Sequence, residues 1–289
     1  MLSLKFLSLS SGSSGNCYFL GRFSEGGKCL GGLLVDAGVS LKRLKTVLWD
    51  NGLEIDDIAA VLVTHDHRDH VRSLASYCKK IYKPVWTSDV LSEALAGHSL
   101  HLSELGVIPN VLRAGEWNAV GDFSVRYFVV PHDATQTVGY AIRIPLGDGY
   151  GLNTGRAKTP TEGSCRQFFI MTDAGRVTDE AVAFARESDT VVFESNYDVD
   201  MLIGGPYTHE LKMRISGGNG HLSNDECAAA VRRFWHPGLK NLFLCHLSEN
   251  NNTPRLAYDA SRAALDAVSD GTTALRPLPR TSPTDLISL

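Results

Sequence analysis

Three histidines and two aspartates lie within the six-residue segment 65–70, His-Asp-His-Arg-Asp-His. The segment follows the apolar run 58–63 and precedes a helical pattern, so the backbone must curl there if its side chains are to face one point. His65 and His67, two residues apart, suit one metal ion, and Asp69 with His70 suits a second. Because a zinc-like ion prefers four or five donors, further ligands must come from elsewhere in the chain.

Three later apolar runs each end in a residue that can bind a metal ion. His132, Asp173 and His246 each follow directly on a strand-like run. An abrupt change from apolar to polar residues is expected where strand ends converge on a site. We therefore predict that these three residues complete a metal centre with the segment 65–70. His and carboxylate ligands suit zinc first, with manganese and iron as alternatives.

Short strand-like runs alternate with helical stretches along the chain, without an internal repeat. Strands are predicted at 4–9, 17–20, 30–35, 59–64, 85–87, 123–130, 138–144, 168–172, 190–194 and 241–245. Helices are predicted at 41–51, 71–81, 88–96, 178–187, 224–235 and 254–268, and the capping residues Ser223 and Thr253 mark the last two starts. The excess of strands favours β-sheets covered by helices, in one sheet or in a sandwich.

One domain is expected over residues 1–270. The segment 147–166 is rich in Gly, Thr and charge and is predicted to be a mobile insertion, and 271–289 with its prolines is predicted to be a flexible tail. The chain has no apolar run near the roughly 18 residues that a membrane span needs, and its N-terminal segment lacks a typical cleavage site. We expect a soluble, cytoplasmic protein. The sequence leaves its oligomeric state open.

Composition limits the classes of partner and site. With 28 Lys and Arg against 32 Asp and Glu, the formal charge of −4 gives no overall attraction for nucleic acid, so any such contact must be local. The 6 cysteines include no C-x-x-C pair, which argues against a disulfide framework and against a structural zinc knuckle.

The pattern H-x-H-x-D-H, followed by a His, an Asp and a His that each close a strand, resembles the metallo-β-lactamase superfamily. The resemblance implies a four-layer αββα sandwich of mixed α/β class that holds one or two metal ions. It also implies the distribution of the ligands: His65, His67 and His132 on one ion, Asp69, His70 and His246 on the other, and Asp173 as the bridge.

Aspartates at positions 69 and 173 resemble the two-metal phosphodiesterase branches more than the zinc β-lactamases. Four further segments, 10–18, 194–198, 220–224 and 246–254, resemble the bacterial YycJ/WalJ exonuclease family. This resemblance implies a two-metal phosphodiester hydrolase that acts through a bridging hydroxide. It also implies that the substrate is DNA ends and that digestion runs in the 5′ to 3′ direction. The length of the segment 147–166 departs from the short hairpin expected there.

Glu194 and His221 match a glutamate and a histidine that are paired in the related tRNase Z enzymes to protonate the leaving group. Two alternatives stay open. Glu194 can instead cap a loop while His221 packs near a helix start, or His221 can replace His246 as a metal ligand.

Substrate contacts are predicted in two places. The Gly- and Ser-rich loop with Ser13 and Asn16 can present hydroxyl and N–H groups to a phosphate, and Lys212 and Arg214 can contact a nucleic acid backbone. The simpler interpretations are a hairpin without a ligand and a solvated basic face. Rival functions are hydrolysis of a small ester, lactone or cyclic phosphodiester in the same site, or metal-stabilised binding without catalysis.

Overall fold

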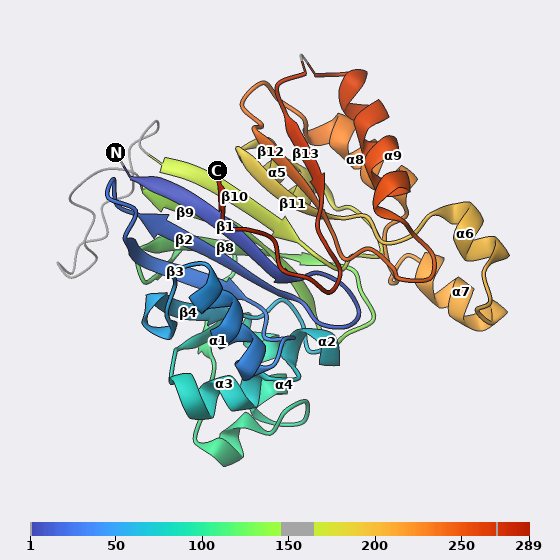
Figure 1. The fold of residues 1–289 in the computed structure, drawn as a ribbon. Coiled ribbons are helices and arrows are strands. Elements are labelled where there is room, and N and C mark those ends of the chain that lie inside the picture. The colour runs from blue at the N-terminus through green and yellow to red at the C-terminus, as the bar shows by residue number, and fades with distance from the viewer. Residues whose placement is uncertain (1, 146–164, 270) are drawn as a thin grey trace.

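Two β-sheets pack face to face in the computed structural model, which describes residues 2–145, 165–269 and 271–289 (Figure 1). Sheet A has, in spatial order, β14 (Ile287–Ser288), β1 (Ser3–Ser10), β2 (Cys17–Phe23), β3 (Cys29–Val35), β4 (Ile58–Leu62), β5 (Val85–Thr87) and β6 (Asn110–Val111). Sheet B has β13 (Ala274–Pro277), β12 (Asn241–Cys245), β11 (Thr190–Glu194), β10 (Cys165–Met171), β9 (Thr137–Pro145), β8 (Phe123–Val130) and β7 (Asn118–Val120).

Large apolar side chains from the inner faces of both sheets form the central core. Phe6 of β1 lies 5.5 Å from Phe168 of β10 and 5.0 Å from Phe243 of β12, measured between ring centroids, and all three side chains are buried. Burying one such ring contributes about 1.5–3 kcal/mol, so contacts of this kind hold the sheets together.

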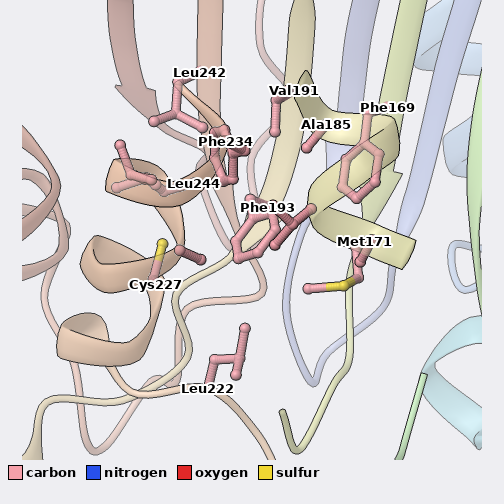
Figure 2. Packing of buried hydrophobic residues seen from close by; sticks show 14 of the residues in the cluster. Phe169, Met171, Ala185, Val191, Phe193, Leu222, Cys227, Phe234, Leu242 and Leu244 are labelled. Atoms are coloured by element: carbon pink, nitrogen blue, oxygen red, sulfur yellow. The ribbon is translucent and has the colours of Figure 1, made fainter. Parts of the chain in front are cut away.

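Helices cover the outer face of each sheet (Figure 1). On sheet A lie α1 (Leu41–Asp50), α2 (Arg68–Val71), α3 (Leu74–Ile81) and α4 (Asp89–Ala96), with the 3₁₀ turns Ile55–Asp57 and Leu102–Leu105. On sheet B lie α5 (Asp179–Arg186), α8 (Asn224–Phe234) and α9 (Pro254–Asp266). Figure 2 shows Phe193 of β11 pointing toward α8, where Phe234 and Cys227 lie. The layers are therefore helix, sheet, sheet, helix, as predicted.

Local sequence explains where two of these helices begin. The Ser223 hydroxyl accepts a hydrogen bond from the Glu226 N–H while the Glu226 carboxylate accepts from the Ser223 N–H, a capping box at the start of α8. Thr253 caps α9, and Pro254 occupies its first turn, where no N–H donor is needed. Both predicted starts are confirmed. Two short helices were not predicted, α6 (Val199–Gly204) and α7 (His209–Ser216), which extend from the body in Figure 1.

The prediction of a flexible tail at 271–289 is wrong. β13 pairs in parallel with β12, and β14 pairs antiparallel with β1, so the segment completes one edge of each sheet. Leu278 between them is buried. Backbone hydrogen bonds to both sheets and this burial offset the entropy that a Pro-containing segment retains when it is free. Of the predicted insertion, 147–164 lies outside the described residues, and 165–166 begin β10. None of the helices in the described ranges combines the length and the apolar character needed to cross a bilayer.

Candidate metal centre and catalytic pocket

Six strands deliver their carboxyl ends to one edge of the sandwich. β3 and β4 are parallel, β10, β11 and β12 are parallel, and β8 runs in the direction of β10 because β9 is antiparallel to both. Polar residues therefore gather at this edge, just after or at the end of each strand: Asp36, His65, His132, Asp173, Glu194 and His246. The short helix α2 follows His67 and supplies Asp69 and His70.

The first group of donors is His65, His67 and His132, with ligand atoms within 4.8 Å of one another. The Nε2 atom of His132 lies 3.2 Å from Nδ1 of His67, while Nδ1 of His132 donates to the Gly220 carbonyl at 2.7 Å. That hydrogen bond fixes the ring so that Nε2 faces the other two histidines. The Nε2 atom of His65 is buried and has no hydrogen-bond partner among the residues that the structure describes.

The second group is Asp69, His70 and His246, and Asp173 lies between the two groups. The carboxylate oxygens of Asp173 lie 3.2 Å from Nε2 of His70, 3.0 Å from Nδ1 of His246 and 3.9 Å from Nε2 of His132. This carboxylate is thus within reach of both groups, as a bridging ligand must be.

Unpaired buried atoms test whether this donor set fits metal ions. Besides Nε2 of His65, Oδ2 of Asp173 and Nε2 of His246 are buried without hydrogen bonds in the described part of the chain. Oδ2 of Asp173 lies 3.2 Å from Nε2 of His70, and Nε2 of His246 lies 3.5 Å from Oδ2 of Asp69, but neither contact has hydrogen-bond geometry. A buried polar atom without a hydrogen bond costs about 1–3 kcal/mol, so a ligand shared by the three atoms would stabilise the site. Imidazole nitrogens and carboxylate oxygens are donors for zinc, manganese and iron. The donor set fits divalent metal ions.

Strong electrostatic coupling marks the centre of the site. Burial by itself lowers the pKa of His70 and His246, but the surrounding carboxylates, Asp173 foremost, raise the pKa of His70 well above its ordinary value and that of His246 to about 10. Burial and the neighbouring His70 hold the pKa of His65 well below its ordinary value. Without metal the second group therefore holds protons, and these must leave when an ion binds.

Asp36 is a supporting residue that the sequence analysis missed. It is fully buried after β3, and its carboxylate accepts hydrogen bonds from Nδ1 of His70 at 2.7 Å and from the N–H and hydroxyl of Thr64 at 2.8 Å. It therefore turns Nε2 of His70 toward the centre. The sequence does carry a signal for Asp36, because this residue follows an apolar run just as His132 does.

Glu194 and His221 form a hydrogen-bonded pair beside the metal ligands. Nδ1 of His221 lies 2.7 Å from Oε1 of Glu194, whose other oxygen accepts from the backbone N–H groups of Ala174 and Leu222. Burial lowers the pKa of His221, but the Glu194 carboxylate outweighs it and raises that pKa above the ordinary value. Glu194 therefore holds two loops and an imidazole at once.

Comparisons with known proteins identify the family of this chain. Residues 32–246 match the profile of the β-lactamase superfamily domain. The chain is 32% identical over 260 residues to "Exodeoxyribonuclease YycJ" of Bacillus anthracis, covering 89% of this chain and 87% of the relative. It is 30% identical over 258 residues to "Exodeoxyribonuclease WalJ" of Streptococcus pneumoniae serotype 2, covering 89% and 86%. The chain belongs to the metallo-β-lactamase superfamily and to its YycJ/WalJ family.

A solved structure carries the same fold. The metallo-β-lactamase fold protein YhfI from Bacillus subtilis superposes with a TM-score of 0.63 at 15% identity, covering 98% of this chain and 99% of that one. Membership of the metallo-β-lactamase superfamily makes this YycJ/WalJ-family chain a metal-dependent hydrolase.

A pocket of about 320 Å³ opens beside the metal ligands. Its walls include His67, Asp69, Asp173 and His246, together with His221. In this member of the YycJ/WalJ family, His221 and four of the candidate metal donors therefore face the same space.

The four predicted substrate contacts have different positions. Ser13 and Arg214 line the pocket, and the Arg214 guanidinium is paired with Asp133 at 2.5 Å. Lys212 lies apart from them: it lines a separate pocket and donates to the Ile203 carbonyl at 2.6 Å.

Asn16 also differs from its predicted role as a substrate contact. Its side chain is fully buried, and its amide nitrogen lies 2.8 Å from Nε2 of His70 and 3.1 Å from Oδ2 of Asp69. Asn16 therefore packs against two metal-site residues and holds them in place. A Gly- and Ser-rich loop pattern does not reveal which of its side chains turn inward.

Proposed function

We propose that this chain is a two-metal DNA exonuclease that hydrolyses phosphodiester bonds from the 5′ end of a strand. One observation carries the proposal: donors from both metal groups and Asp173 line a pocket together with His221, whose imidazole is held by the buried Glu194. Such a site has a place for both ions, for a phosphate and for a proton donor. The names of the two relatives, both exodeoxyribonucleases, support DNA as the substrate class, and the direction rests on resemblance alone.

Two of the four overlapping donor groups match the ligand sets that we propose, and another joins Asp173 and His246 to Glu194 and His221. His65, His67 and His132 would hold one ion, Asp69, His70 and His246 the other, and Asp173 both. When bound, the ions lower the pKa of a water molecule from 15.7 toward about 7 and neutralise charge on the phosphoryl oxygens. The His246 assignment is favoured over His221, because Nε2 of His246 lies 3.5 Å from Oδ2 of Asp69 and His246 shares a donor group with Asp69 and His70, which His221 does not. Zinc is our first candidate, ahead of manganese and iron.

His221 is the proposed proton donor to the departing oxygen. Its Nδ1 atom is held by Glu194, so Nε2 is the nitrogen that serves the pocket. The buried carboxylate favours the protonated imidazole, since it raises the pKa of His221 above its ordinary value. Proton transfer by a positioned side chain typically accelerates a reaction about 10²- to 10⁴-fold.

Cleavage of end-labelled DNA tests the proposal. The chain, loaded with Mn²⁺ or Zn²⁺, is given single- and double-stranded DNA labelled at the 5′ or 3′ end, closed circular DNA, a simple phosphodiester and a lactone. We expect mononucleotides or short products from the 5′ end and no attack on closed circles. Rapid hydrolysis of the lactone with DNA left intact would instead establish the small-ester alternative.

Two variants of neighbouring aspartates control for contaminating nucleases. Asp69→Asn removes a proposed metal ligand and should abolish the activity. Asp66→Asn changes the other acid of the same segment, whose carboxylate accepts from Ser99 and Thr135 at 2.6 and 2.5 Å and belongs to no donor group. Asp66→Asn should retain most of the activity. Equal activity in both variants would show that the cleavage comes from another protein.

A further inference from the structure

An apolar wall faces the metal centre across the pocket space. Tyr207, Leu211 and Ile215 follow one another at intervals of four residues and all line the pocket that contains the metal donors. Leu211 and Ile215 belong to α7, so this spacing places them on one stripe of the helix. Met213, on the same helix, lines a different pocket instead. Helix α7 therefore separates two spaces, and only one of its stripes faces the site.

Close backbone contacts fix this wall relative to the catalytic residues. The His221 N–H donates to the Ile215 carbonyl at 2.8 Å, and a Cβ on Gly220 would lie only 2.1 Å from that same oxygen. A Cβ on Gly175, two residues after Asp173, would lie 2.4 Å from Gly218. The loops that carry His221 and Asp173 thus pack directly against the end of α7, so the wall is held at a constant place.

The loop that follows His246 orients the aromatic ring of the wall. The Asn250 side-chain amide donates to the Tyr207 hydroxyl at 2.8 Å, and Asn250 lies four residues after His246. Tyr207 is only half-buried, so part of its ring is accessible. A ring that is fixed at its hydroxyl and open to the pocket is suited to stack on a flat ligand.

The size and chemistry of the pocket point to one kind of ligand. About 320 Å³ is at the lower end of small-ligand pockets, which start near 300 Å³, so it holds a group the size of one nucleotide. Metal donors on one side suit a phosphate, and an apolar wall with one aromatic ring on the other suits a base. The three side chains of the wall carry no charge, so they offer a surface for the face of any base rather than for one base edge.

We propose that Tyr207 and Leu211, with Ile215 beside them, bind the base of the terminal nucleotide while its phosphodiester lies at the metal centre. This inference rests on the proposed exonuclease function and adds the part of the substrate that the wall recognises. Stacking of one base on an aromatic side chain corresponds to roughly 5- to 100-fold in affinity.

Abasic substrates test the wall separately from the metal chemistry. Two oligonucleotides are identical except that the nucleotide at the digested end has either a base or a tetrahydrofuran residue in its place. The wild-type chain should cleave the substrate with the base roughly 5- to 100-fold better, measured as kcat/KM. Tyr207→Ala and Leu211→Ala should lower kcat/KM only for the substrate with the base, toward the value for the abasic substrate. Tyr207→Phe should keep most of the preference, because it keeps the ring and loses only the hydrogen bond from Asn250.

Met213→Ala is the matched control on the other side of α7, at a side chain that is 58% exposed, and it should behave as wild type. Calorimetry can measure the same preference without turnover, as the difference in affinity between a deoxynucleoside monophosphate and deoxyribose 5-phosphate. Tyr207→Ala should lose this difference. If Tyr207→Ala slows both oligonucleotides equally, or if the wild-type chain does not distinguish them, the wall does not bind a base. If no DNA is cleaved at all, the proposed function fails, and this inference fails with it.

Discussion

At the scale of single residues, the proposed mechanism gives Glu194 and His221 two different tasks. The Glu194 carboxylate is fully buried and fixed by two backbone N–H groups, so it holds the imidazole without moving itself. The imidazole lines the pocket, where a leaving group would accept its proton. A fixed acceptor behind a histidine sets both its orientation and its charge.

The first prediction concerns His221→Ala. This variant should keep a metal content near wild type and lower the turnover of DNA by about 10²- to 10⁴-fold, because it removes the proton donor and no proposed ligand. A nitrophenyl phosphodiester should lose much less, since nitrophenolate departs without a proton. Glu194→Gln should give the same pattern more mildly. Metal analysis and steady-state kinetics on both substrates provide the measurement.

His246→Ala is the contrasting variant for that experiment. It should lose metal and should lose activity on both substrates together, because His246 belongs to the second donor group. If His221→Ala loses a metal ion while His246→Ala retains both, the two histidines have exchanged roles and the proton donor must be sought elsewhere.

The second prediction concerns the protons of the metal-free site. Carboxylates raise the pKa of His246 to about 10 and that of His70 well above its ordinary value, so the metal-free site favours the protonated form of both rings. A metal ion must displace these protons, so metal binding should release about two of them and the affinity should fall as the pH is lowered. Calorimetric metal titrations near pH 7.5, repeated in buffers of different ionisation enthalpy, give the number of protons released. His246→Ala should release fewer protons, and an affinity that does not change between pH 8 and pH 6 would contradict the prediction.

At the scale of elements, the strand ends were the part of the site that sequence could reveal. An apolar run that stops at His132, Asp173 or His246 shows both the strand and the residue at its end, because burial and polarity change at one position. Helix α7 gave no such signal, since it has no buried residue in the described structure. Its position depends on contacts with loops far away in sequence, and a local pattern does not contain those contacts.

The third prediction uses two glycines in the loop between α7 and His221. Gly220→Ala would place a Cβ 2.1 Å from the Ile215 carbonyl oxygen, so the loop and its histidine must shift. We expect a loss of stability of about 1–3 kcal/mol and a lower kcat. The first donor group should also bind its ion more weakly, because the Gly220 carbonyl orients His132. Gly218→Ala is the control, because a Cβ there meets no atom within 4 Å. Chemical denaturation and kinetics compare the two variants, and equal behaviour would show that the close approach has no functional role.

At the scale of the whole molecule, the segment 271–289 connects both sheets with the site. Its composition indicated flexibility, because prolines report only on local conformation. Its order comes from strand pairing with β12 and β1, and β14 lies more than 200 residues from its partner β1 in the sequence. Between these strands, the Arg280 carbonyl accepts from the N–H of Ser11 and the hydroxyl of Ser10. The Arg280 guanidinium donates to the Ser248 carbonyl at 2.8 Å. One residue thus joins the loop before β2 to the loop that follows His246.

The last prediction follows from this connection. A chain ending at residue 279 keeps β13 but loses Arg280 and β14, and it should release both loops. The loop before β2 carries Asn16, which contacts Asp69 and His70, and the other loop begins at His246. Asp69, His70 and His246 together form the second donor group. Occupancy of that group should therefore fall before occupancy of the first.

Metal titration against a competing chelator measures this loss, and denaturation of the metal-free chain measures the accompanying loss of stability. A chain ending at residue 285 is the control, since it removes β14 while Arg280 and its contacts remain. It should lose stability, because β1 becomes an unpaired edge, but it should bind the second ion as the full chain does. If both shortened chains lose that ion equally, the pairing of β14, and not Arg280, supports the metal centre.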